Sequence, residues 1–408
     1  GSDSRPRSAK NKLKIASLNI KGYGQEDRAN GSNKWLLVNQ LIRQSRIGVL
    51  ALQETHLDCA RAETLDRIFG ADMTVLRSED PENSTAARGV AFVINKRIVK
   101  PEGEVRFSEV IKGRAATLTV PRRGDEPMCV LNVYGPNNAA QNAAFWAELK
   151  SKLTCRVDIM LGDFNIVEDA IDRIPARMDS GSAVDALRDL RSSKNLTDLW
   201  RVQNPATKVY TYMQVATGSQ SRLDRIYVNR RIARDLDGWG HDEPGIPTDH
   251  KLVSVKVTNR REPFVGKGRW SMPAHLLNDD VVKKAMRELG AKLCSEIAGI
   301  RERSDCDNPQ KSYASFKEDL SKSIRDRAKR KIPKIQRQID SLKEALGIVL
   351  NATGTSADEV ERNKEEAAEI QDRLNKLEIK RFGWTRNDVA TKHWAQAETN
   401  TKYWTKAN

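Results

Sequence analysis

The sequence predicts an α/β domain made of two packed β-sheets with helices on their outer faces, followed by an all-α extension. Three observations support this prediction. From about Leu13 to Val257, short runs rich in β-branched residues alternate with helical or loop segments. Beyond Asn259 such runs stop, and apolar residues recur at helical spacing instead. The chain of 408 residues is also long enough for two or three domains.

Eight segments of the first part are predicted to be strands, because they are short and apolar and several alternate with a period of two. In chain order they are LKIASLNI, IGVLALQE, GVAFVIN, ATLTV, CVLNVY, DIMLG, LDRIYVN and LVSVKV. Helices are predicted for residues 34–45, 138–153 and 184–192. Strands and helices in this proportion favour two sheets covered by helices.

A segment punctuated by glycine and proline, residues 259–273, is predicted to be a linker to a helical region at 274–408. That region has a heptad-like stripe of Ile335, Ile339, Leu342, Leu346 and Val349. The segment NATGTS interrupts it, and a similar stripe resumes with Val360, Ala367, Ile370, Leu374 and Leu377. Two stripes joined by a short loop predict an antiparallel helical hairpin at about 334–382. Such a hairpin would pack within its own domain or bind another protein.

The composition favours an anionic partner. The formal net charge is +15, which makes nucleic acid the first candidate. Five cysteines without a CxxC spacing favour a reducing compartment over a disulfide framework or a zinc site. No run approaches the roughly 18 apolar residues of a membrane span, so no membrane association is expected. Residues 1–11 are predicted to be a disordered basic tail.

Polar side chains stand where several predicted strands end or begin. They are Asn19, Glu54, Asp163, Asn165, Asp224, Asp249 and His250. Each alone has an ordinary explanation as a turn or capping residue. Together they favour hydrolysis of a phosphodiester, which needs a carboxylate for a hard cation, a group that orients water and a group that stabilises charge on the phosphate. Glu54 suits the first task, Asp163 with Asn165 the second and His250 the third.

The motifs QET, NVYGPN, GDFN, SRLDRIYV and TDHKLV resemble the endonuclease/exonuclease/phosphatase superfamily, which includes exonuclease III, AP endonucleases, DNase I and inositol-phosphate 5-phosphatases. The resemblance covers residues 12–258. It implies a four-layer α/β sandwich with the motif residues at one rim of the paired sheets. It also implies that Glu54 holds Mg²⁺, with Mn²⁺ as a substitute, assisted by Asn19 and Asp249.

The same resemblance implies roles for the remaining site residues. Asp163 would polarise the attacking water or protonate the leaving oxygen, with Asn165 in the same network. Tyr134 would donate to the scissile phosphate, His250 would contact that phosphate as an electrophile, and Asp224 would orient the imidazole. The sequence leaves open whether Asp163 or His250 is the general base.

Lys21 departs from the family pattern, because nucleases of the family often carry an acid or a glycine there. It is expected to contact phosphate, and it argues against a second metal site. The segment from Lys322 to Arg337 has eight basic residues against one acid. This segment would contact DNA or RNA, act as a nuclear-import signal or form a solvated helical face. The expected contacts to DNA are Lys21, Tyr212, Arg222, Lys329, Arg330 and Lys331.

Longer stretches resemble the endonuclease of non-LTR (LINE-type) retrotransposons, namely NIVEDAIDRIPAR, SRLDRIYVN, GIPTDHKLVSVKV and FVGKGRWSMP. HWAQAETNTKYWTKAN resembles the segment that joins such an endonuclease to its reverse transcriptase. The resemblance implies a Mg²⁺-dependent endonuclease that nicks one DNA strand, leaving a 3′-hydroxyl to prime reverse transcription.

The expected partners are double-stranded DNA, the element RNA and the reverse transcriptase of the same polyprotein, which residues 274–408 would precede. The nucleus is the expected location. The alternatives are an AP endonuclease of DNA repair, a phosphatase of the same fold and a nucleic-acid-binding protein without activity.

Overall fold

The structure of the chain is a computed structural model. It describes residues 11–24, 34–101, 103–214, 218–259, 272, 276, 279–302, 304, 308–352 and 357–397. The predicted basic tail, the predicted linker and the NTKYW motif fall largely or wholly on residues outside this part of the chain. The chain divides into two compact units, residues 1–266 with 347–368 and residues 267–346 with 369–408. The predicted domain boundaries stay predictions.

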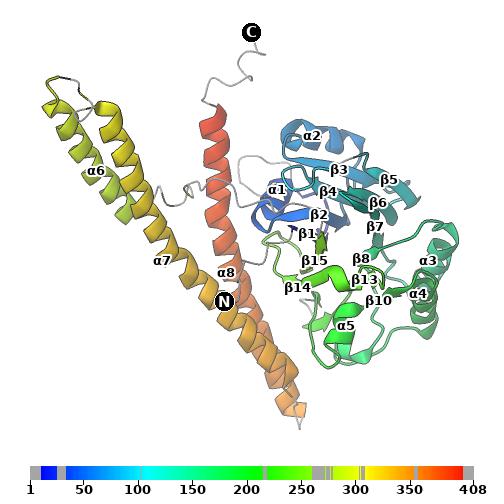
Figure 1. Cartoon of the computed structure of the whole chain (residues 1–408). Helices are drawn as coiled ribbons and strands as arrows, with labels where there is room; N and C mark the ends of the chain where they lie inside the picture. Colours follow the sequence, from blue (N-terminus) through cyan, green and yellow to red (C-terminus); the bar gives the residue numbers. More distant parts are fainter. Residues whose placement is uncertain are drawn as a thin grey trace, which may run out of the picture. The chain divides into compact units, whose positions relative to one another are not determined.

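Two six-stranded mixed sheets form the framework of the first unit (Figure 1). The first sheet has the order β14-β15-β1-β2-β4-β3, with β14 (Leu236–Asp242), β15 (Leu252–Asn259), β1 (Asn11–Asn19), β2 (Ile47–Gln53), β4 (Val90–Asn95) and β3 (Met73–Ser78). The second has the order β10-β13-β8-β7-β6-β5, with β10 (Leu196–Thr197), β13 (Asp224–Asn229), β8 (Ile159–Asp163), β7 (Asp125–Tyr134), β6 (Ala115–Arg122) and β5 (Arg106–Ile111). A small third sheet joins β11 (Tyr212–Gln214), β12 (Ser219–Ser221) and β9 (Arg173–Ile174).

An apolar core lies between the two large sheets. Ile15, Val49 and Phe92 of the first sheet share one buried cluster with Leu118 and Ile159 of the second. Each of these side chains is fully buried. Burial of apolar surface on this scale is the main favourable term in the stability of the domain.

Helices cover the outer faces of the two sheets (Figure 1). The short helices of this unit are α1 (Lys34–Gln44), α2 (Cys59–Phe69), α3 (Ala139–Lys152), α4 (Gly181–Ser193) and α5 (Leu199–Gln203), with 3-10 turns η1 (Ala170–Asp172) and η2 (Ala233–Asp235). Trp146 of α3 and Leu187 of α4 pack in a second buried cluster with Leu131, Met160 and Tyr227 of the second sheet. The predicted sandwich of two sheets flanked by helices is therefore confirmed.

A buried polar contact joins the two sheets next to the ends of β2 and β7. Nε2 of Gln53 donates to Oδ1 of Asn132 at 2.7 Å, and Nδ2 of Asn132 donates to backbone carbonyls of β2 and β4 at 3.0 Å. Both side chains are fully buried. An unmade hydrogen bond here would cost about 1–3 kcal/mol, so the contact favours one alignment of the sheets.

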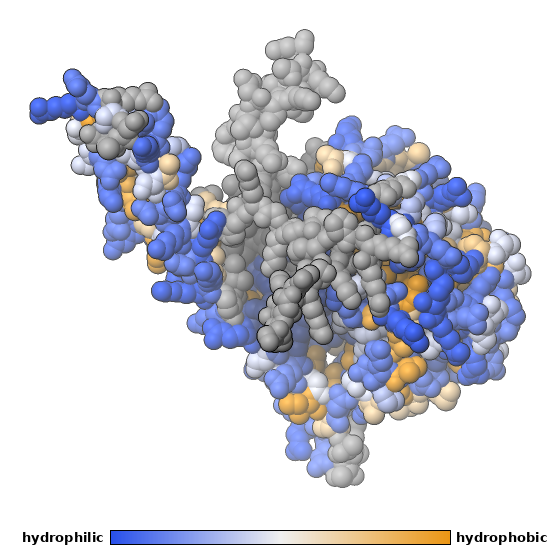
Figure 2. Space-filling view, viewed as in Figure 1, coloured by the Kyte–Doolittle hydropathy of each residue, from blue (hydrophilic) through white to orange (hydrophobic). Residues whose placement is uncertain are grey.

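Three long helices follow the sandwich, α6 (Asp280–Gly299), α7 (Pro309–Asn351) and α8 (Ala357–Ala397). The predicted helical extension is thus confirmed. Ile335 and Ile339 of α7 pack against Leu374 of α8, with Leu342 and Leu377 beside them. The visible face of α6 and α7 is mostly hydrophilic (Figure 2). Within the described residues, none of the helices combines the length and the apolar character needed to cross a lipid bilayer.

Candidate active site

The candidate site lies at one rim of the paired sheets, where several strands end or begin. β1 and β2 run parallel, so Asn19 at the end of β1 lies beside Glu54, which follows β2. β7 and β8 are also parallel and place Tyr134 beside Asp163. β13 runs antiparallel to β8, so it begins at this rim with Asp224 opposite Asp163. Strand direction alone therefore gathers five polar side chains.

The turn after β8 explains the motif GDFN. Gly162 has φ of 146°, and a Cβ there would lie 1.9 Å from the carbonyl oxygen of Val133, so only glycine fits against β7. Asn165 has φ of 52°, in the left-handed region that asparagine tolerates best after glycine. Its backbone N–H donates to Oδ1 of Asp163 at 3.0 Å, and its Nδ2 donates to the carbonyl oxygen of Gly135 at 2.9 Å. The turn thereby holds the Asp163 carboxylate in place.

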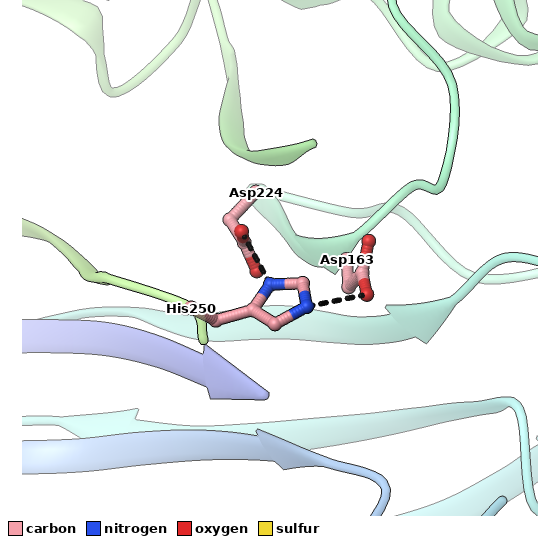
Figure 3. Close-up of side chains that lie close together, drawn as sticks. All are labelled: Asp163, Asp224 and His250. Atoms are coloured by element: carbon pink, nitrogen blue, oxygen red, sulfur yellow. Dashed lines mark hydrogen bonds and ion pairs between the residues drawn. The ribbon is translucent and has the colours of Figure 1, made fainter. Parts of the chain in front are cut away.

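His250 lies between two carboxylates (Figure 3). Its Nδ1 is 2.9 Å from Oδ2 of Asp224, and its Nε2 is 3.8 Å from Oδ2 of Asp163. All three side chains are buried. Burial opposes the charge on the imidazole, but Asp224 and Asp163 outweigh it and raise the pKa of His250 to about 10. His250 is therefore a cation at neutral pH.

Asp163 is the second group in this trio with a perturbed pKa. Burial raises the pKa of Asp163 to about 6, although the positive charge of His250 opposes the rise. Asp163, Asp224 and His250 each offer an atom that could bind a metal, and these atoms lie within 4.8 Å of one another. Because the imidazolium already offsets one of the two negative charges and occupies the space between the acids, a divalent cation suits this trio less well than it suits Glu54.

Glu54 is held by two donors that reach the same oxygen. Nδ2 of Asn19 donates to Oε1 of Glu54 at 2.9 Å, and the hydroxyl of Tyr134 donates to it at 2.9 Å. The same amide nitrogen of Asn19 donates to Oδ2 of Asp163 at 3.0 Å. Burial and the nearby Glu54 and Asp163 raise the pKa of Tyr134, so its hydroxyl keeps its proton. Asn19 therefore links Glu54 to the group formed by Asp163, Asp224 and His250.

Glu54 has the chemistry of a ligand for a divalent cation, because hard divalent cations prefer carboxylate and other oxygen ligands. In the part of the chain that the structure describes, no hydrogen-bond donor reaches Oε2 of Glu54, the oxygen on which a cation would bind. Oδ1 of Asn19 accepts from the backbone N–H of Lys21 at 3.0 Å, while its Nδ2 faces the carboxylates. Asn19 thus orients Glu54, and its role as a metal ligand stays a prediction. A divalent cation bound here would polarise a phosphate oxygen and lower the pKa of a bound water.

Asp249, the other predicted metal ligand, is paired with a lysine. Nζ of Lys21 donates to Oδ2 of Asp249 at 2.8 Å, and 62% of the Lys21 side chain is exposed. Burial opposes the ionisation of Asp249, but the hydrogen bond from Lys21 and the positive charges of His250 and Lys21 together lower the pKa of the carboxyl. An exposed ammonium is thus held beside the candidate cation site.

Lys34, Thr248 and Thr211 support this site, and the sequence did not predict them. Nζ of Lys34 donates to the carbonyl oxygen of Lys21 at 2.7 Å. Oγ1 of Thr248 donates to the carbonyl oxygen of Asn19 at 2.8 Å, and Oγ1 of Thr211 accepts from the backbone N–H of Asp224 at 2.9 Å. Thr248 stands directly before the Asp-His pair and Thr211 between two tyrosines, but neither has a pattern that reveals its contact.

The prediction that Arg222 contacts DNA was wrong. Its side chain is buried, Nε donates to Oδ1 of Asp172 at 2.8 Å, and Nη2 donates to Oδ2 of Asp198 at 2.7 Å. A buried arginine with two carboxylate partners stabilises the fold, here by joining the segments that carry Asp172 and Asp198. Tyr212, by contrast, is partly exposed, and its ring centroid lies 4.9 Å from that of His250.

The predicted contacts on α7 remain predictions. Lys329 and Arg330 are exposed, and Nζ of Lys329 lies 3.7 Å from Oδ1 of Asp326. The side chain of Lys331 lies outside the described residues. Exposed cations at these positions are compatible with either a solvated face or a contact to phosphate.

Residues 16–250, which include the rim site from Asn19 to His250, match the Endonuclease/Exonuclease/phosphatase family. The chain belongs to this family. Membership in this family confirms the predicted enzyme class, a phosphodiester hydrolase. A divalent metal is typical of the family, and the Glu54 carboxylate supplies oxygen of the kind that such a metal binds.

Comparison with known proteins adds a transposon relative. Over 290 residues, 68% of this chain, the sequence is 31% identical to the transposon TX1 uncharacterized 149 kDa protein of Xenopus laevis. The chain spans 20% of the length of that relative.

Similar solved structures include an AP endonuclease from Leishmania major and the endonuclease domain of TRAS1, a telomere-specific non-LTR retrotransposon. The first has a TM-score of 0.48 and 17% identity, over 61% of this chain and 88% of the other. The second has a TM-score of 0.44 and 14% identity, over 62% of this chain and 100% of the other.

Proposed function

We propose that this chain is a Mg²⁺-dependent DNA endonuclease of a non-LTR retrotransposon, which nicks one strand of a duplex. The observation that supports the proposal is the meeting of Glu54, Asn19 and Tyr134 with Asp163 and the buried His250 at one rim of the sandwich. The transposon relative and the net charge of +15 favour nucleic acid over a small phosphorylated substrate.

In the proposed reaction, water attacks phosphorus, the bond to the 3′ oxygen breaks and that oxygen takes a proton from solvent, leaving a 3′-hydroxyl and a 5′-phosphate. Asp163, held by Asn165, orients the water and takes its proton when it is ionised. The imidazolium of His250 and the hydroxyl of Tyr134 stabilise the charge that develops on the phosphate oxygens. Glu54 would hold the cation, and Lys21 would contact an adjacent phosphate.

In its biological setting, the 3′-hydroxyl would prime reverse transcription of the element RNA in the nucleus. The helical region would bind that RNA or the reverse transcriptase of the same polyprotein. The exposed cations of α7, among them Lys329 and Arg330, support a contact to a polyanion.

A supercoiled plasmid tests the proposal. Wild-type protein with Mg²⁺ should produce open-circle DNA that ligase reseals, because ligase requires a 3′-hydroxyl beside a 5′-phosphate. EDTA should abolish nicking, and Mn²⁺ should restore it. The His250→Ala variant should lose nicking, whereas Lys150→Ala, an exposed change on α3, should not.

Three outcomes would contradict the proposal. Equal nicking by His250→Ala would point to a contaminant or to another catalytic group. Cleavage restricted to an oligonucleotide with an abasic site would favour the repair enzyme instead. Release of phosphate from inositol phosphates without nicking would favour the phosphatase.

A further inference from the structure

The turn that follows β1 fixes the backbone of Lys21 beside Glu54. Lys21 has φ of 53°, a left-handed conformation that a residue with a Cβ adopts at a cost, so its neighbours must hold it there. Its backbone N–H donates to Oδ1 of Asn19 at 3.0 Å, and its carbonyl oxygen accepts from Nζ of Lys34 at 2.7 Å. The N–H of the next residue, Gly22, donates to the carbonyl oxygen of Glu54 at 2.7 Å.

Asp249 reaches the same ammonium from the segment that precedes β15. Oγ1 of Thr248, the residue before it, donates to the carbonyl oxygen of Asn19 at 2.8 Å, and the carbonyl oxygen of Asp249 accepts from the backbone N–H of Met213 at 3.4 Å. Nζ of Lys21 donates to Oδ2 of Asp249 at 2.8 Å. The side chain of Asp249 is 22% exposed and that of Lys21 is 62% exposed. The ammonium is therefore anchored on one side and open to solvent on the other.

Asp249 and Glu54 differ in the charge of the groups that bind them. An ammonium already offsets the charge of Asp249, and it would repel a divalent cation placed on the same carboxylate. Glu54 receives its hydrogen bonds from the amide of Asn19 and the hydroxyl of Tyr134, which carry no charge. Of these two acids, Glu54 is thus the one to which a divalent cation is attracted.

We propose that Asp249 is a positioning residue for the Lys21 ammonium and not a metal ligand, so that the site holds one divalent cation at Glu54 and uses Lys21 as its second positive charge. This role replaces the one that the family resemblance implies for Asp249. The inference rests on the proposed function, because the anion that the ammonium contacts is a backbone phosphate of the DNA. A lysine ammonium is a compact charge that binds a phosphate oxygen without a fixed geometry, so a carboxylate anchor supplies the missing placement.

Metal binding is measured first, by calorimetric titration of the full chain with Mn²⁺ in the absence of DNA. We expect Glu54→Gln to weaken Mn²⁺ binding by at least about 10-fold and Asp249→Asn to change it by less than about 3-fold. Two results would overturn the proposal. One is a loss of Mn²⁺ affinity in Asp249→Asn as large as in Glu54→Gln. The other is a second Mn²⁺ in the wild type that Asp249→Asn removes.

A double-mutant cycle then tests whether Asp249 acts through Lys21. Lys21→Met should reduce the slope of the logarithm of the DNA-binding constant against the logarithm of the salt concentration, measured in EDTA, by about 0.9, which corresponds to one phosphate contact. The same change should slow single-turnover nicking by roughly 10-fold. In an Asp249→Asn background it should slow nicking far less, because the ammonium has already lost its anchor. Equal slowing in both backgrounds, or an unchanged salt slope, would contradict the proposal.

The matched control is the exposed ion pair between Lys12 of β1 and Asp237 of β14 in the same sheet. Lys12→Met and Asp237→Asn should leave Mn²⁺ affinity and nicking unchanged, and an equal loss of nicking in these variants would overturn a specific role for Lys21. Circular dichroism and thermal unfolding check that each variant is folded. A wild-type protein that does not nick DNA would refute the proposed function, whereas the Mn²⁺ titrations would still decide the role of Asp249.

Discussion

Replacing Asp224 by asparagine removes one negative charge from beside His250 while keeping the shape of the side chain. Oδ2 of Asp224 lies 2.9 Å from Nδ1 of the imidazole, and Asp224 is fully buried. Burial favours the neutral imidazole, so the charge on His250 depends on its acidic partners, of which Asp224 has the largest effect. We expect the Asp224→Asn variant to have a lower pKa at His250 and a slower chemical step.

The size of the effect follows from the pKa. A rise from 6.5 to about 10 corresponds to about 5 kcal/mol of net stabilisation of the imidazolium. If Asp224 supplies about half of it, the variant loses about 2–3 kcal/mol of that stabilisation, so the alkaline limb of the rate profile moves down by roughly 1.5–2 pH units and nicking at pH 9 falls about 4- to 10-fold. Among the described residues Oδ1 of Asp224 has no hydrogen-bond partner, so an amide nitrogen in its place would cost about 1–3 kcal/mol of folding stability.

The assay is single-turnover nicking of a supercoiled plasmid between pH 5.5 and pH 10, with circular dichroism and thermal unfolding of each protein. Asp185→Asn, an exposed change of the same kind on α4, is the matched control and should nick at the wild-type rate. The reasoning is refuted if Asp224→Asn folds and nicks at the wild-type rate across this range. A slower variant whose alkaline limb has not moved would show that Asp224 acts by orientation alone.

Three further predictions concern other groups. Wild-type nicking should fall as the pH drops below about 6, because Asp163 becomes protonated. It should fall again towards pH 10, because His250 loses its proton. Nicking confined to the alkaline end of the range would instead make neutral His250 the base. Burial lowers the pKa of His241 to about 4. Below pH 6.5 the unfolded chain therefore binds a proton that the folded chain does not bind. The free energy of unfolding should decline by about 2–3 kcal/mol between pH 6.5 and pH 4. Urea unfolding of His241→Gln should lack that decline, and an equal decline in the variant would assign it to other groups. Replacing Lys329 and Arg330 by alanine should reduce the slope of the logarithm of the DNA-binding constant against the logarithm of the salt concentration by up to about two. Unchanged binding at every salt concentration would show that this face of α7 is only solvated.

The central strands were predictable because their pattern is local. All eight predicted strands are present, as β1, β2, β4, β6, β7, β8, β13 and β15. The strands that the sequence did not predict include β3, β5 and β14, each at the edge of its sheet. Most side chains of β5 and β14 are partly or fully exposed, so these strands lack the buried apolar runs that mark a central strand.

The residues of the site were predictable as chemical types, but their contacts were not. The acids and the imidazole at strand ends, together with the family motifs, indicated phosphodiester chemistry. Arg222 was assigned wrongly because it is adjacent in sequence to residues near the site while its side chain turns into a buried ion pair.

The sequence by itself determined eight of the strands, the helical extension, the excess of positive charge and the presence of carboxylates, an amide and an imidazole at strand ends. Periodicity and composition act over a few neighbouring residues and need no knowledge of the fold. Only the tertiary structure decided that Asn19 bonds to both Glu54 and Asp163, and that His250 carries a proton between two buried acids. Those facts depend on which strand ends meet and how far water is excluded, because burial and neighbouring charges set a pKa.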